Sequence, residues 1–114
     1  SVDGPVKAGE ARSKAERELL DFESVFGALA HASRRHILYV LHYRGGQMTA
    51  GEIADRFACS WPTTRHHLRI LEEAGLVKVE KRGRERVYVL DAARLSSVAE
   101  RWLERFGGRR KDAK

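Results

Sequence analysis

The chain has little of what builds disulfides, metal cages or membrane spans. Its single cysteine is Cys59, so neither an internal disulfide nor a cage of cysteine ligands can form. The longest apolar runs, Val25–Ala30 and Ile37–Leu41, are far shorter than the roughly 20 residues that span a bilayer. The first 18 residues contain acids and bases without an apolar block, so we expect no secretory signal. We therefore expect a cytoplasmic protein with no membrane partner.

Positive charge is in surplus and unevenly distributed. The chain holds 22 Lys and Arg against 16 Asp and Glu among 114 residues, for a formal net charge of +6. This length suits one domain. Three blocks, residues 31–46, 61–86 and 107–114, each carry +3. A small basic protein favours nucleic acid as a partner, although a charge run is also typical of a solvated face.

The ends of the chain differ from its middle. Residues 1–11 contain glycine and proline without periodicity, so we expect a flexible N-terminal arm, and we expect residues 107–114 to form a disordered basic tail. Residues 12–106 then make up the domain. Apolar residues at helical spacing predict a first helix from about Arg12. A second helix follows, with Ser33 as the expected N-cap and Gly45-Gly46 as its end.

The next segment predicts a helix-turn-helix. Thr49 and Glu52 have the spacing of a capping box at the start of a short helix. Ser60 is a second N-cap candidate, followed by Pro62 in the first turn, where a missing N–H costs nothing. Gly75 is placed to end this second helix in the left-handed conformation. Two such helices joined by a short turn are typical of the motif.

Two short strands and a last helix complete the prediction. Leu76–Lys81 and Arg86–Leu90 are rich in Val and Tyr, and the polar segment between them predicts a hairpin. Asp91 can cap a final amphipathic helix. The predicted fold is therefore mainly α with a small β-hairpin wing, an α+β winged helix-turn-helix.

The second helix of the motif enters the DNA major groove. If Thr64, Leu68 and Leu71 face inward, polar and basic residues fall on the outer face. Arginine can clasp guanine in a fork, and a helix N-terminus can hold a phosphate. The residues expected to contact DNA from this helix are Ser60, Trp61, Thr63, Arg65, His66 and Arg69. Those expected to do so from the wing are Lys81, Arg82, Arg84 and Arg86. The competing interpretation is a solvated basic face.

The chain resembles the ArsR/SmtB family, bacterial and archaeal winged-helix repressors that bind palindromic operators as homodimers. The similarity covers about residues 22–106 and is most specific from Ser60 to Val77. The matching segments are 30–38, 52–54, 60–71, 73–77, 83–84 and 88–90. The resemblance implies base reading by Thr63, Arg65 and His66, and His67 matches a histidine common in the family. Trp61-Pro62 departs from it, because small polar residues usually stand there.

Many members of that family sense metals, and this chain lacks their usual ligand motifs. Residues 49–57 contain no cysteine and residues 91–106 no histidine. A transition-metal site needs several converging ligands. We therefore expect no metal and no cofactor, and the effector stays unknown.

Cys59 has two interpretations. A free cysteine just before the recognition helix packs well as a small buried residue in a tight turn, which is the interpretation we favour. Alternatively, it is a redox switch, because oxidation there would disturb the turn that aims the helix. In that case oxidant weakens DNA binding, and Cys59→Ser removes the sensitivity. Equal sensitivity in the variant would dispose of the switch.

The two terminal helices carry more apolar surface than one small core can cover, which predicts a homodimer. Its expected interface residues are Leu19, Phe22, Phe26, Leu95, Val98, Trp102, Leu103 and Phe106. The function predicted is a sequence-specific regulator, a repressor, that binds double-stranded DNA at an inverted repeat. The alternatives are a winged-helix protein-interaction module and a non-specific DNA-binding protein. No catalytic constellation can be assembled, so we do not expect an enzyme.

Overall fold

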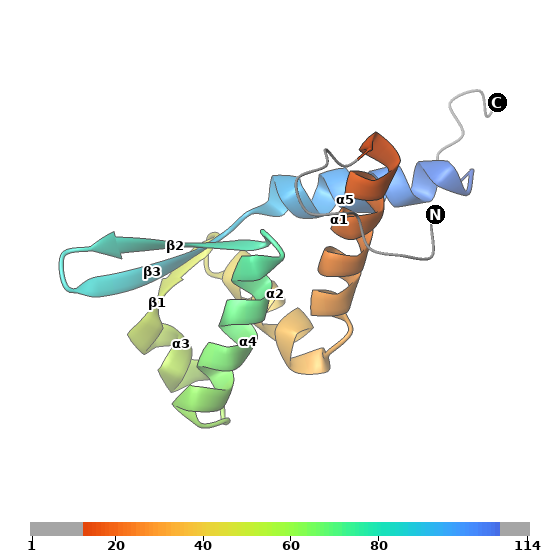
Figure 1. The fold of residues 1–114 in the computed structure, drawn as a ribbon. Helices are drawn as coiled ribbons and strands as arrows, with labels where there is room; N and C mark the ends of the chain where they lie inside the picture. Colours follow the sequence, from red (N-terminus) through yellow and green to blue (C-terminus); the bar gives the residue numbers. More distant parts are fainter. Residues whose placement is uncertain (1–12, 108–114) are drawn as a thin grey trace.

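The computed structural model describes residues 13–107. Within them the chain folds as a winged helix-turn-helix, which confirms the predicted fold class (Figure 1). The elements in chain order are α1 (Lys14–Leu29), α2 (Ala32–Tyr43), β1 (Gln47–Thr49), α3 (Ala50–Arg56), α4 (Trp61–Glu73), β2 (Val77–Arg82), β3 (Glu85–Leu90) and α5 (Ala92–Arg105). The predicted N-terminal arm and basic tail lie outside the described residues, apart from Gly107.

Side-chain caps define where most helices begin. The Thr49–Glu52 capping box and the Ser60 and Asp91 caps all form as expected. The first helix, α1, begins at Lys14, slightly after the expected start near Arg12, because Ser13 caps it in a box with Glu16.

The predicted cap of α2 is wrong. His31, not Ser33, is the N-cap, and its Nδ1 accepts the backbone N–H of Ser33 at 3.1 Å. The helix begins two residues earlier than a Ser33 cap requires, because an imidazole nitrogen takes the acceptor role that serine usually fills.

The sheet contains a strand that the sequence pattern does not reveal. The order is β1-β3-β2, and three-residue β1 pairs antiparallel with β3, with Met48 opposite Tyr88. The predicted hairpin is present, with the two strands running as far as Arg82 and Glu85. Gly83 opens the two-residue turn with φ of +63°, a conformation that other residues rarely adopt.

α1 and α5 cross beside the core, on the side of the molecule away from the wing (Figure 1). Val98 of α5 is fully buried. The Trp102 ring of α5 packs edge-on against the Phe22 ring of α1, with 5.2 Å between the ring centroids. Arg94 of α5 donates to the Ala74 carbonyl just after α4. The last helix is thus bonded directly to the end of the recognition helix.

Candidate DNA-binding surface

The recognition helix α4 buries one stripe and exposes the other. Thr64, Leu68 and Leu71 are each at most 1% exposed, so the inward face is as predicted. His67, at 7% exposed, lies on that buried side as well. The outer face exposes Thr63, Arg65, His66 and Arg69, together with the Ser60 cap.

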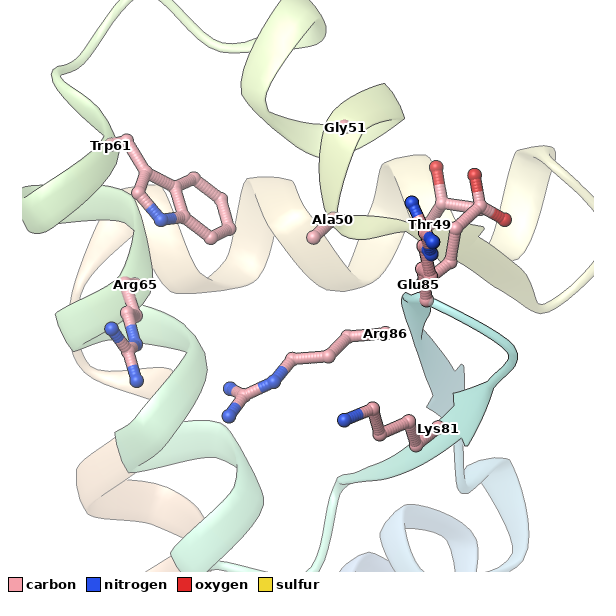
Figure 2. A pocket seen from close by; sticks show the side chains of 9 residues that line it. Thr49, Ala50, Gly51, Trp61, Arg65, Lys81, Glu85 and Arg86 are labelled. Atoms are coloured by element: carbon pink, nitrogen blue, oxygen red, sulfur yellow. The ribbon is translucent and has the colours of Figure 1, made fainter.

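A basic cleft separates α4 from the wing (Figure 2). It has a volume of about 450 Å³. Its lining residues are Thr49, Ala50, Gly51, Trp61, Arg65, Lys81, Arg84, Glu85 and Arg86. Four of them are cationic side chains and one is a carboxylate, so the cleft has a net positive charge. Figure 2 shows Arg65 on α4, with Arg86 and Lys81 extending from the wing toward it.

Strand register concentrates the wing's charge in this cleft. Lys81 and Arg86 lie directly opposite each other in the hairpin, two residues along from the pair of Val79 and buried Tyr88. Because side chains alternate between sheet faces, both cations share the core-facing side with Tyr88. Like charges placed opposite each other are unfavourable unless an anion joins them. The cleft is therefore suited to bind a phosphate.

Arg82 is placed differently from the other predicted wing residues. Its guanidinium bonds Glu80, with Nε at 3.1 Å from Oε1, and reaches Gln47 Oε1 at 3.4 Å. By alternation it lies on the sheet face opposite Lys81. Among the cations of α4 and the wing, Arg65, Arg69, Lys81, Arg84 and Arg86 make no ion pair within residues 13–107, so these five have charge available for a ligand.

The three arginines of the positive block at residues 31–46 are bonded within the fold. Arg34 Nε donates to the Ala28 carbonyl at 2.7 Å, and Arg35 donates to the Leu29 carbonyl at 2.8 Å. Both carbonyls lie in the last turn of α1, and that turn has no basic residue of its own. Two arginines from the next helix thus satisfy them. Arg44 pairs with Glu52 at 3.6 Å.

Trp61 lies half-buried at the start of α4, where it packs against the hydrophobic core and lines the basic cleft (Figure 2). Its ring therefore contributes to the wall between α4 and α3. The part of the indole that faces the cleft stays within reach of a ligand there.

The expected dimer residues fall into three groups by exposure. Leu19, Trp102, Leu103 and Phe106 are 39–70% exposed, while Phe26 and Leu95 are half-buried. Phe22 and Val98 are buried inside the single chain, so they belong to its own core and leave an interface almost no surface. Leu20, 46% exposed, adds to the apolar surface of α1, although it lies outside the helical stripe that the sequence pattern reveals.

Cys59 is exposed, so its interpretation as a buried residue is wrong. The turn between α3 and α4 directs its side chain outward, beside a cleft shared with Ser33, His36 and Arg56. The redox interpretation stays a prediction.

The described residues contain neither a metal cluster nor a membrane-spanning helix. Among residues 13–107 there is no group of three or more His, Cys, Asp or Glu arranged to hold a metal. No helix in the same range is long and apolar enough to cross a membrane.

Comparison with known proteins agrees with this geometry. A family model described as a helix-turn-helix domain matches residues 29–80. The transcriptional repressor SdpR of Bacillus subtilis is 37% identical over 83 residues, which cover 73% of this chain and 89% of SdpR. A cadmium resistance regulatory protein, a CadC homolog of Staphylococcus aureus, is 32% identical over 76% of this chain and 71% of its own.

Solved structures show the same fold. An ArsR-like transcriptional regulator from Rhodococcus sp. RHA1 has 36% identity and a TM-score of 0.68, covering 78% of this chain and 81% of that one. A homodimeric winged helix-turn-helix domain from Mycobacterium bovis, with 22% identity, covers 92% and 97% of the two chains at a TM-score of 0.63.

The fold, the exposed basic helix and these relatives define a DNA-binding transcriptional regulator rather than an enzyme. The chain belongs to the ArsR/SmtB family of winged-helix regulators.

Proposed function

We propose that this protein is a homodimeric repressor that recognises an inverted repeat in double-stranded DNA. The observation that carries the proposal is the basic cleft between α4 and the wing, which is lined by Arg65, Lys81, Arg84 and Arg86 and by a single carboxylate. This cleft adjoins the exposed face of α4. A duplex lying on that face brings its phosphates to the cleft while its major groove receives the helix.

In this proposal, different residues contact the bases and the phosphates. Thr63, Arg65, His66 and Arg69 contact base edges, and their exposure on the outer face of α4 supports this role. The Ser60 hydroxyl already accepts the Thr63 N–H, so the cap holds the start of the helix in place for a phosphate. Trp61 and the wing cations contact the flanking backbone and supply salt-dependent affinity.

The second copy is proposed from the apolar surface of the terminal helices. Leu19 and Leu20 on α1 and Leu103 and Phe106 at the end of α5 are all at least 46% exposed. Apolar surface of this kind on two neighbouring helices marks an interaction site. A twofold dimer through these helices presents two α4 helices to half-sites about 34 Å apart. SdpR is itself named a repressor, which supports repression over activation. Such a regulator acts in the cytoplasm.

Selection of random and genomic duplex fragments on the purified protein tests the proposal. We expect enrichment of an inverted repeat with half-sites about one turn apart. Binding without enrichment that weakens as salt rises would leave a non-specific DNA-binding protein. Absence of binding at every salt concentration would favour the protein-interaction module.

A further inference from the structure

His67 is set apart from the other ionisable side chains of α4 because it is buried. Its Nδ1 lies 3.2 Å from a terminal nitrogen of Arg34, at the start of α2. The same guanidinium donates through Nε to the Ala28 carbonyl in the last turn of α1. One side chain thus connects the end of α1, the start of α2 and the inner face of the recognition helix.

The hydrogen bond with Arg34 indicates the protonation state of His67. A guanidinium only donates hydrogen bonds, so Nδ1 of His67 must accept. The ring is therefore neutral, with its proton on Nε2. A second ring proton, added at Nδ1, would point at the Arg34 N–H group and place two positive charges side by side. The hydrogen bond to Arg34 would then break.

Among the residues that the structure describes, the groups around His67 offer a positive charge no compensation. The His31 ring lies 4.6 Å from that of His67 between centroids, and its Nδ1 also acts as an acceptor, for the Ser33 N–H. The His66 ring, on α4 itself, lies 6.0 Å away. On the side facing α3, His67 lines a cleft of about 320 Å³ with Ser33, His36, Ile37, Arg56, Phe57, Ala58, Cys59 and Thr64. None of these is a carboxylate.

This environment lowers the pKa of His67 below its ordinary value of 6.5, first through burial and then through the charges of His31, Arg34 and His66. An unfolded chain therefore binds more protons here than the folded one at pH values just below 6.5. It follows that the folded arrangement loses stability as the pH falls from about 6.5 toward the lowered value. The Arg34–His67 bond is therefore expected to weaken as the ring gains a proton in acid.

We propose that His67 is a positioning residue for DNA recognition, holding α4 in its reading orientation only while its neutral ring accepts the hydrogen bond from Arg34. This rests on the proposed function, because it takes α4 as the helix that reads DNA. Arg65 and His66 stand on the exposed side of the same helical turns, so a shift of α4 away from Arg34 moves both of them relative to the wing.

The acid response separates this role from simple electrostatics. Exposed histidines that gain protons near phosphates strengthen DNA binding as the pH falls. Breaking the Arg34–His67 bond acts in the opposite direction. A binding affinity that falls in mild acid, through His67 alone, is therefore the expected signature.

The experiment compares wild type with His67→Asn by fluorescence anisotropy on the selected duplex, at constant ionic strength. Asparagine Oδ1 can take the place of Nδ1 as acceptor for Arg34 and does not titrate. Both proteins should bind alike at about pH 7.5. On going to about pH 5.5, the affinity of wild type should fall relative to His67→Asn, with about tenfold as the upper bound, because that is the fall for a histidine of ordinary pKa and the pKa of His67 is lower. His42→Asn, at an exposed histidine of α2 outside the proposed DNA-binding surface, should keep the acid response of wild type.

Imidazole ¹⁵N NMR of the wild type gives a second readout that needs no DNA. At neutral pH the His67 ring should be the Nε2–H tautomer, and amide signals across α4 should shift with the midpoint of that ring. Equal acid responses of wild type and His67→Asn, or an Nδ1–H ring at neutral pH, would overturn the positioning role, and the NMR titration decides it if the variant does not fold. A wild type that prefers no duplex while showing the expected tautomer would instead show that the proposed function has failed, and the role in DNA recognition with it.

Discussion

Leu103→Glu should convert the proposed dimer to a monomer and lower the affinity for the proposed inverted repeat by about 10²–10⁴-fold, because two linked helices bind two half-sites as one event and a monomer forfeits that gain of effective concentration. Leu103 is 48% exposed on α5, near the exposed ring of Phe106, so the substitution leaves the core of the single chain intact. In the dimer it would bury a carboxylate in apolar surroundings, which is strongly unfavourable. Light scattering at micromolar protein and anisotropy on the selected duplex measure the two effects.

Ser97→Glu provides the matched control. Ser97 is exposed on the same helix, and at 100° per residue it lies on the side of α5 opposite the stripe of Leu95, Trp102 and Phe106. It adds the same charge without touching the proposed interface, so mass and affinity should stay those of wild type. A dimeric Leu103→Glu protein, or a monomer that keeps wild-type affinity, would contradict the assignment of this surface.

Features set by a few neighbouring residues can be predicted from the sequence. The Thr49–Glu52 box and the Ser60 cap depend on side chains three residues from their backbone partners. Such spacings can be recognised in the amino-acid sequence. The left-handed Gly75, with φ of +79°, belongs to the same class. These local signals are enough to place the recognition helix and the wing.

Features that depend on distant partners cannot be predicted in this way. β1 has three residues and exists because β3 pairs with it, so no alternation of its own could reveal it. Arg34 contributes to a basic block in the sequence, yet in the structure it bonds Ala28 and His67. His31 and His67 are far apart in the chain, and only the packing of α2 against α4 brings their rings together.

The candidate DNA-binding surface also combines features that the sequence predicts with features that only the folded structure reveals. Helical periodicity identifies the exposed face of α4, because one turn repeats every 3.6 residues. The wing residues are predicted from charge alone, and charge does not distinguish the two faces of a strand. The structure separates Lys81 and Arg86, which line the cleft, from Arg82, which is bonded to Glu80.

Arg65→Ala should weaken operator binding and relax base preference, whereas Arg84→Ala should weaken binding to all duplexes alike. Arg65 projects from the exposed face of α4 and has no ion-pair partner within residues 13–107. Removal of one arginine–base interaction costs about 1–3 kcal/mol, and a twofold dimer forfeits it in both half-sites, or about 2–6 kcal/mol in total. Competition of single-base operator variants against the selected sequence measures the preference.

Salt dependence tests the other half of this division. Arg84 lies in the turn at the end of the wing. Its removal should therefore make the negative slope of log K against log salt shallower, by about 1 for each phosphate that it neutralises. Arg82→Ala is the matched control, since its guanidinium is already bonded to Glu80 and Gln47, and it should change the slope less than Arg84→Ala. Should Arg84→Ala change base preference while Arg65→Ala leaves it intact, the roles assigned to helix and wing are reversed. The outer face of α4 would then serve mainly to bind the backbone, and sequence would be read from the wing.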